Sequence, residues 1–406
     1  MTSPCEHHPQ ATTTVPAHRR QCAVPPYLLE QMAQYLPDAP TDEPTDVPAD
    51  TSPPSAPGPS IRPPQVPGRT SPPPVPHWDA ELPADVGRTL ELDEKVRELR
   101  HRGLLPDRAI TAPTGTLNRT VSDAQGTEEL PGTTVRSEGE DPVEDPAVNE
   151  AYDGVGSVYA FLEEIYRQSS LDGTGLELLA TVHYGRRYDN AFWDGTQMVF
   201  GDGDGEIFTG FTPSLSVIAH ELAHGLMQYS TDLVYEGQSG ALNESFADVL
   251  GVLVDQYAHG HTAEDATWLI GAEVFGPDVQ ATALRSLAAP GTAYDDPRLG
   301  KDPQPAHLDD FVETESDYGG VHQNSGIPNK AFHLAATALG GHAWERAGQV
   351  WFDVVTGGAI PADVDFAGFA EATVASARDR FGEEVAGTID EAWRQVGVLT
   401  AAEVTA

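Results

Sequence analysis

The sequence is poor in cysteine, in basic residues and in long apolar runs, and each shortage excludes something. It has two cysteines, Cys5 and Cys22, so the chain from residue 23 onward must fold without a disulfide. No stretch approaches the roughly 18 apolar residues of a membrane span, and the first residues lack the apolar core of a signal peptide. The 63 acidic residues against 23 Lys and Arg give a net charge of −40, which disfavours nucleic acid and anionic membranes as partners.

The N-terminal quarter of the chain differs in composition from the rest. Residues 37–76 are rich in proline and follow neither helical nor strand spacing, which is typical of an extended, disordered tether. The charge pairing that follows predicts a helix near residues 88–102. We therefore assign residues 1–107 to a separate N-terminal segment.

The remainder of the chain predicts an α+β protein with two lobes. Short runs at 176–185 and 196–205 end in glycine turns and indicate a β-rich lobe. Helical patterns dominate the second half, so we expect a catalytic lobe over 108–255 and a mainly helical lobe over 256–406. Within the first lobe one apolar helix face is predicted, formed by Val158, Phe161, Leu162 and Ile165.

The stretch HELAH, residues 220–224, suggests a metal site. On a helix, His220 and His224 lie on one face and can direct ring nitrogens at one ion, with Glu221 beside them. Because this composition produces His-acid-x-x-His by chance roughly 0.07 times per chain, a third ligand is needed. Glu244 follows on the next predicted helix. Two histidines and one glutamate leave a fourth position open, as in catalytic zinc sites.

Nearby positions refine this interpretation. Asp248 lies one helical turn beyond Glu244, where it either accepts the second ring N–H of a ligating histidine or is an ordinary solvated carboxylate. A metzincin is excluded because Met227 and Ser230 stand where its glycine and third histidine belong. A zinc aminopeptidase of this type is disfavoured because position 243, where its glutamate would stand, holds Asn243.

Six motifs occur in a fixed order: AVNEAYDG (147–154), NAFWDG (190–195), MVFGDGDG (198–205), HELAHG (220–225), GALNESFADVLG (240–251) and GGVHQNSGIPNKAF (319–332). With them the chain resembles the thermolysin-like neutral zinc metalloproteases over about residues 117–398. The stretch CAVPPYLLE (22–30) is similar to the short propeptide of the protealysin branch. The resemblance implies a two-lobed zincin, made as a proenzyme, that cuts peptide bonds on the amino side of bulky hydrophobic residues.

The resemblance also implies a role for each matching residue. Zinc would be held by His220, His224 and Glu244, with Glu221 as general base. Tyr235 and His322 would stabilise the tetrahedral intermediate, and Asp317 would orient His322. Asn190, Ala191 and Arg285 would hold the substrate backbone. The pocket for the residue after the scissile bond would be walled by Phe208, Phe211, Val217 and Leu284, which outside the resemblance would be ordinary core.

The chain departs from the family pattern where a double calcium site is expected. Ser216 stands in place of an acid four residues before the first zinc histidine, and TWLIGA (267–272) replaces an acidic cluster of which only Asp255 remains. We therefore expect zinc as the cofactor and no double calcium site.

Several further expectations leave alternatives open. The thiolate of Cys22 could fill zinc's open position in the precursor, or Cys22 is an ordinary buried or surface thiol. The resemblance implies secretion although no signal peptide is recognised; cytoplasmic residence or non-classical export is the alternative. We expect a monomer that acts on protein or peptide substrates. The rival function is a catalytically silent zincin that serves as a binding module.

Overall fold

The computed structural model describes residues 21–35, 86–93, 116–231 and 233–400. The tether predicted at 37–76 lies outside these ranges, as do Cys5 and residues 94–102 of the predicted helix. Residues 86–93 are helical, in agreement with the first part of that prediction. No helix of the described ranges is long and apolar enough to cross a membrane.

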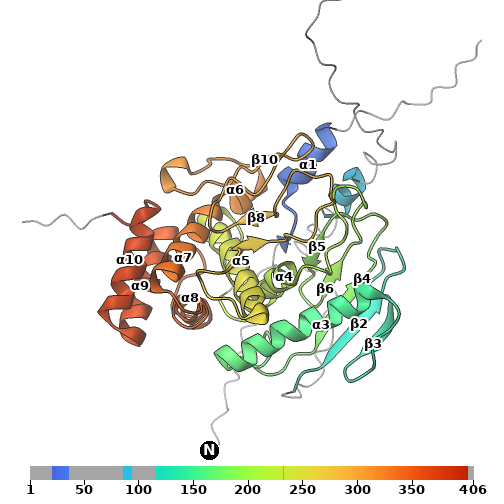
Figure 1. The fold of residues 1–406 in the computed structure, drawn as a ribbon, viewed down its shortest axis with the longest axis horizontal. Coiled ribbons are helices and arrows are strands. Elements are labelled where there is room, and N and C mark those ends of the chain that lie inside the picture. Colours follow the sequence, from blue (N-terminus) through green and yellow to red (C-terminus); the bar gives the residue numbers. More distant parts are fainter. Residues whose placement is uncertain (1–20, 36–85, 94–115, 232, 401–406) are drawn as a thin grey trace, which may run out of the picture.

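A six-stranded sheet forms one side of the molecule (Figure 1). Its order is β1-β5-β6-β4-β2-β3, and β4 runs parallel to both β2 and β6 while the other neighbours are antiparallel. The strands are β1 (Gln21–Cys22), β2 (Arg119–Asp123), β3 (Thr133–Ser137), β4 (Leu178–Val182), β5 (Ala191–Trp193) and β6 (Met198–Phe200). Two small ribbons pair β7 (Leu269–Ile270) with β8 (Arg285–Ser286) and β9 (Asp295–Asp296) with β10 (Gly300–Lys301).

Helices make up most of the remaining structure. Those before residue 260 are α1 (Pro26–Tyr35), α3 (Pro146–Phe161), α4 (Leu215–Gln228) and α5 (Gly237–His259). Those after it are α6 (Asp317–Asn324), α7 (Gly326–Leu339), α8 (Ala347–Thr356), α9 (Phe366–Phe381) and α10 (Glu383–Gln395). In Figure 1, α4 and α5 lie between the sheet and the group α7 to α10. The predicted α+β fold, with a β-rich first lobe and a helical second lobe, is confirmed.

The helices α4 and α5 are the central elements of the fold. Every residue of α4 from Ser216 to Met227 is buried, which is typical of a helix that is covered on all sides. The two helices approach closely because α5 carries Gly251, where a Cβ would lie 2.7 Å from the carbonyl oxygen of Ser216. Polar side chains on such buried helices must find partners inside the protein.

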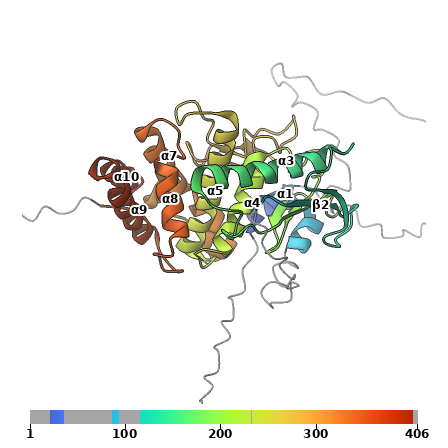
Figure 2. The ribbon, with the colours of Figure 1, turned by 90° about the horizontal axis from the view of Figure 1, so that it is seen from below.

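Residues 21–35 pack against the six-stranded sheet although they are remote from most of it in sequence. Strand β1 extends the sheet at β5, with Cys22 opposite Phe192. Helix α1 follows, begun by Pro26, and buries Leu28, Leu29 and Met32. Figures 1 and 2 both place α1 against the folded body.

Candidate zinc site and cleft

Helices α4 and α5 bring the three predicted zinc ligands together. The Nε2 atoms of His220 and His224 lie 3.2 Å apart. Glu244 reaches them from α5, with Oε2 at 3.5 Å from His220 Nε2 and Oε1 at 3.7 Å from His224 Nε2. All three side chains are buried. In the described part of the chain this is the one group of three such ligands close enough to share an ion.

Hydrogen bonds on the far side of each ring fix which nitrogen carries the proton. His220 Nδ1 lies 2.8 Å from Oδ1 of Asp248, and His224 Nδ1 lies 2.9 Å from Oδ1 of Asn243. Because both partners are acceptors, each neutral ring carries its proton on Nδ1. Both Nε2 atoms therefore present lone pairs to the same point.

This arrangement fits a zinc ion. Two lone pairs and a carboxylate converge in a buried space, where they repel one another without a cation between them. Burial, aided by the neighbouring His220, lowers the pKa of His224 well below its usual value and so favours the neutral ring that a metal needs. Glu244 Oε2 accepts no hydrogen bond from the described residues, which leaves it available to a metal.

Asp248 is fully buried and does not act as a solvated carboxylate. It accepts hydrogen bonds from His220, from Nε and Nη2 of Arg285 at 2.9 Å each, and from Nδ2 of Asn329 at 2.8 Å. Burial alone raises the pKa of Asp248, but the charge of Arg285 and the His220 ring outweigh it and hold the pKa well below its usual range. A permanently charged Asp248 thus orients one zinc ligand and one cleft arginine.

Glu221 lies on α4 directly after the first ligand and is fully buried. Its Oε2 accepts a hydrogen bond of 2.9 Å from the backbone N–H of Trp193 in β5. This hydrogen bond joins strand β5 to the carboxylate predicted as general base.

Tyr235, His322 and Asp317 form a second polar group beside the ligands. The hydroxyl of Tyr235 donates to Glu244 and lies 3.3 Å from His322 Nε2, and His322 Nδ1 lies 2.7 Å from Asp317 Oδ1. Burial lowers the pKa of His322, but the carboxylates of Asp317 and Glu244 outweigh it and raise the pKa to about 9. Both groups can donate a proton in a hydrogen bond.

The backbone of residues 317–320 explains why Asp317 reaches His322. All four residues have positive φ, between 51° and 84°, so the chain turns tightly at the start of α6. Asp317 thereby also accepts from the backbone N–H of His322 at 2.9 Å. The two glycines in this turn, Gly319 and Gly320, adopt such φ values without strain.

The residues predicted to hold a substrate backbone instead hold the chain's own N-terminal segment. Ala23 donates its N–H to the carbonyl of Ala191 at 3.1 Å, and Arg285 Nη1 donates to the carbonyl of Ala23 at 2.9 Å. The Asn190 side chain accepts from the N–H of Val24 at 2.9 Å and donates to its carbonyl at 3.2 Å. The cleft is therefore filled by an extended peptide.

The four residues predicted as the pocket wall, Phe208, Phe211, Val217 and Leu284, are all buried in one core cluster. The ring centroids of Phe208 and Phe211 lie 5.4 Å apart, with the ring planes tilted by 35°. Gly271 lies behind the wall at φ 68°, and a Cβ there would lie 2.7 Å from Cδ1 of Leu284. Because residue 271 is a glycine, the side chain of Leu284 can occupy this position without a clash.

Cys22 is buried, and its side chain packs in a small cluster with Leu92, Tyr188 and Phe192. Among the described residues, the group whose ligand atoms lie close enough to hold one metal ion is His220, His224 and Glu244, without Cys22. Burial and the carboxylate of Glu244 raise the pKa of the Tyr235 hydroxyl well above its usual value.

The positions at which the family pattern places calcium ligands make other interactions here. Ser216 Oγ accepts a hydrogen bond of 3.0 Å from the N–H of Gly271, which ties α4 to the segment that replaces the acidic cluster. Asp255 pairs with His259 at 3.4 Å.

Three contacts of the site were missed from the sequence. Asn243 was weighed only against the aminopeptidase alternative, although its place directly before Glu244 marks it as a partner of His224. Asn329 lies within the motif at 319–332, yet nothing in that motif indicated that its side chain donates a hydrogen bond to Asp248. The N–H of Trp193 is a backbone group and leaves no trace in the sequence.

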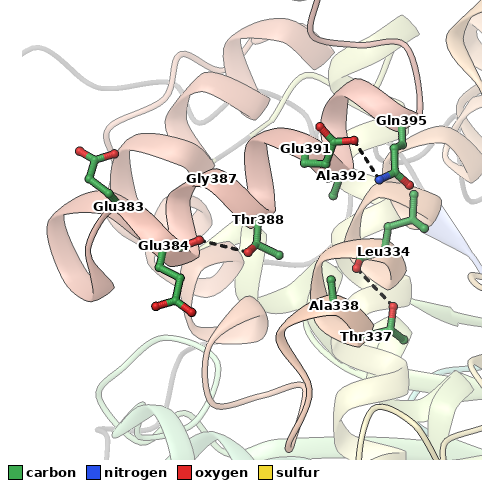
Figure 3. Close-up of a pocket in the computed structure, with 10 residues that line it drawn as sticks. All are labelled: Leu334, Thr337, Ala338, Glu383, Glu384, Gly387, Thr388, Glu391, Ala392 and Gln395. Atoms are coloured by element: carbon green, nitrogen blue, oxygen red, sulfur yellow. Dashed lines mark hydrogen bonds between the residues drawn. The ribbon is translucent and has the colours of Figure 1, made fainter.

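A separate pocket of about 730 Å³ lies between α7 and α10 (Figure 3). Glu383, Glu384 and Glu391 lie on α10 around it, and Leu334 and Thr337 line it from α7. It contains none of the candidate site residues.

The buried ligand set, the adjacent carboxylate and the peptide-filled cleft define a zinc peptidase. A family model described as the catalytic domain of thermolysin metallopeptidase matches residues 105–228, and one described as its alpha-helical domain matches residues 231–398. The chain belongs to the thermolysin family of metallopeptidases, and is a zinc metalloendopeptidase of that type.

Individual relatives agree with this assignment. An extracellular metalloprotease of Pectobacterium carotovorum subsp. carotovorum is 52% identical over 286 residues, 70% of this chain and 82% of the relative. Protease PrtS of a Photorhabdus species is 48% identical over 285 residues, 70% of this chain and 77% of the relative. The solved precursor of protealysin, a metalloproteinase from Serratia proteamaculans, matches with a TM-score of 0.76 and 41% identity, covering 93% of this chain and all of that chain.

Proposed function

We propose that the chain is the precursor of an endopeptidase that cuts proteins or peptides on the amino side of bulky hydrophobic residues. The ligand group of His220, His224 and Glu244 beside Glu221 carries this proposal. The apolar wall of Phe208, Phe211, Val217 and Leu284 supports the preference for a large apolar side chain.

The proposed roles follow from what each side chain can do. When bound, zinc supplies Lewis-acid chemistry, which acidifies a water molecule and polarises the carbonyl of the substrate. Glu221 takes a proton from the attacking water and returns it to the leaving nitrogen. Tyr235 and His322 donate hydrogen bonds to the carbonyl oxygen as it becomes negative, and Asp317 holds His322 in place.

Substrate positioning is proposed for the residues that now hold the N-terminal segment. Asn190 and Ala191 pair with the backbone of an extended peptide, and Arg285 holds one of its carbonyls. Asp248 accepts hydrogen bonds from both Arg285 and His220 and so holds them at fixed positions relative to each other.

The proposal includes an inactive precursor whose residues 1–107 are removed, leaving lobes over 108–255 and 256–406. The contacts of Ala23 and Val24 in the cleft support it, because a substrate cannot pair with β5 while β1 occupies that edge. The names of the extracellular relatives support secretion, and we propose that the mature enzyme acts as a monomer without a double calcium site.

The decisive experiment is hydrolysis of casein by the purified, matured protein, with and without a zinc chelator, alongside Glu221→Gln. We expect cleavage by the wild type and its loss in both controls. A matured wild type that binds zinc but shows no chelator-sensitive cleavage would replace the proposal with a silent zincin that serves as a binding module.

A role of Cys22 as a zinc ligand in the precursor is a separate proposal. The position of Cys22 directly before Ala23, which Arg285 holds beside the ligand His220, supports it, and its packing against Tyr188 and Phe192 does not. Precursor activity and maturation rate should both rise in Cys22→Ser. If both stay as in the wild type, the thiol is only a packing group.

A further inference from the structure

The segment around Ala23 binds the cleft in the register of a peptide substrate. Ala23 and Val24 together make four hydrogen bonds with Ala191, Arg285 and Asn190, and both residues are fully buried. All four bonds are made to backbone atoms of the segment, by one strand carbonyl and two side chains, so the same groups can hold any extended sequence.

The contacts also locate one peptide bond at the zinc ligands. On one side, Arg285 Nη1 holds the carbonyl of Ala23 while its Nη2 lies 3.4 Å from Nδ1 of the ligand His220. On the other side, Cys22 lies opposite Phe192 in β5, and the next residue of β5, Trp193, donates its N–H to Glu221. The bond between Cys22 and Ala23 therefore lies between the carbonyl held by Arg285 and the part of β5 that is bonded to Glu221.

The side chains of these two residues face opposite sides of the sheet. Cys22 lies opposite Phe192 in the pairing and shares its cluster, on the side away from α4. Since successive residues of a strand alternate, Ala23 faces the other side, and it belongs to the core cluster that contains Phe208, Val217 and Leu284. The chain thus presents a methyl group on the side of the apolar wall.

We propose that the bond between Cys22 and Ala23 is a self-cleavage site, placed for hydrolysis but cut slowly because the side chain of Ala23 is too small for the pocket. The inference rests on the proposed function. Ala23 is then the residue that makes the segment an inhibitor instead of a substrate.

The reaction is an ordinary hydrolysis and needs no further reactant. The oxygen of one water bonds to the carbonyl carbon of Cys22, and the bond from that carbon to the nitrogen of Ala23 breaks. Glu221 carries the proton from the water to the released nitrogen. One product ends at Cys22 and the other begins at Ala23.

The size of the side chain decides the rate. One methylene in an apolar pocket changes kcat/KM by about 10-fold or more, so replacing the methyl of alanine by the side chain of leucine should accelerate cleavage by about 100-fold or more. The test is Ala23→Leu in the full-length chain, followed by intact mass over time. We expect rapid release of residues 1–22 from the variant and slow release from the wild type.

Two variants control for indirect effects. Ala23→Leu combined with Glu221→Gln should stay intact, which excludes a contaminating protease. Val24→Leu adds bulk one position further along the same strand and should leave the bond after Cys22 slow to cut. Equal, rapid cleavage in Val24→Leu and Ala23→Leu would overturn the proposal, because loosening of the segment would then explain the effect.

The failure of this inference differs from failure of the proposed function. If Ala23→Leu stays intact while the matured wild type cuts an external peptide with leucine after the scissile bond, the inference is wrong and the function stands. If the matured enzyme cuts neither, the proposed function fails.

Peptides keep the test independent of how the variant folds. A peptide of residues 21–32 should inhibit the matured enzyme and be cut slowly, whereas the same peptide with leucine at position 23 should be cut after the cysteine. Both should bind Glu221→Gln in calorimetry. Cleavage of the two peptides at equal rates, or at another bond, would contradict the assignment of this site.

Discussion

His220 and Arg285 share one buried carboxylate, that of Asp248, so a zinc ligand and the arginine proposed to hold the substrate are positioned by the same group. Neither can shift without disturbing the other. This coupling predicts that a single substitution affects metal binding and substrate binding together.

We predict that Asp248→Asn raises the dissociation constant for zinc by about 10- to 100-fold, because the ring of His220 loses its charged partner. KM for a peptide substrate should rise as well, since Arg285 loses its charged anchor. Titration against a chelator of known affinity measures the first effect. Asp255→Asn, on the same helix but paired only with His259 among described groups, is the matched control. Wild-type zinc affinity in Asp248→Asn would disprove the coupling.

Tyr235→Phe removes one of the two hydrogen-bond donors proposed for the developing oxyanion. We expect kcat to fall by about 100-fold with KM and zinc content little changed, because the donor acts mainly in the transition state. Steady-state kinetics on a short peptide and metal analysis give the three quantities. Tyr257→Phe, whose hydroxyl bonds Glu164 at the surface, should behave as wild type. A raised KM with unchanged kcat would instead indicate a role in substrate binding.

His183 predicts a pH dependence of stability away from the zinc site. Its Nδ1 lies 2.8 Å from Asp202 and its Nε2 lies 2.8 Å from Asp145. The hydrogen bond to Asp202, with help from Asp145 and against burial, raises its pKa from 6.5 to about 9. A raised pKa means that the protonated ring stabilises the fold fully below about pH 6.5, and that this contribution is lost as the pH rises through about 9.

The test is thermal unfolding of His183→Gln. Because both partners are partly exposed, we expect a Tm lower than that of the wild type by no more than about 3 °C at neutral pH. The difference should disappear above about pH 10, where the wild-type ring is neutral. A difference that grows with pH would have the wrong sign and would refute the assignment.

Ser216 and residues 267–272 lack the acidic side chains that a double calcium site needs, which predicts that calcium does not affect the stability of the matured enzyme. The Tm of the matured enzyme should be the same with calcium as with a calcium-selective chelator, because Ser216 Oγ and the N–H of Gly271 already join the segments. A zinc chelator, in contrast, should abolish activity. A calcium-dependent rise of several degrees in Tm would establish a calcium site that the pattern did not predict.

Local spacing was sufficient to predict the ligands, because the positions of His220 and His224 on one helix follow from helical geometry alone. Glu244 and Asp248 could be added since they share one face of the next helix. The resemblance contributed Tyr235, His322 and Arg285, whose sequence distances from the ligands give no indication that they lie nearby.

Other features could not be predicted from local patterns. Val158, Phe161, Leu162 and Ile165 were predicted as one helix face, but the α-helix ends at Phe161 and residues 162–166 form a π-helical turn. Strand β1 has only two residues, too few for any periodicity, and it is a strand because it pairs with β5. Such pairing depends on tertiary contacts between residues about 170 positions apart.

The proposed loss of β1 on maturation would make β5 the outermost strand of the described sheet and uncover the carbonyl of Ala191, which now accepts the N–H of Ala23. An enzyme that binds through such an edge needs a stretch of polypeptide free to straighten, so loops and denatured regions should be attacked before compact domains. The same edge can capture a second copy of the enzyme. Keeping the segment that contains β1 in place until use is therefore expected to protect concentrated enzyme from aggregation as well as from self-digestion.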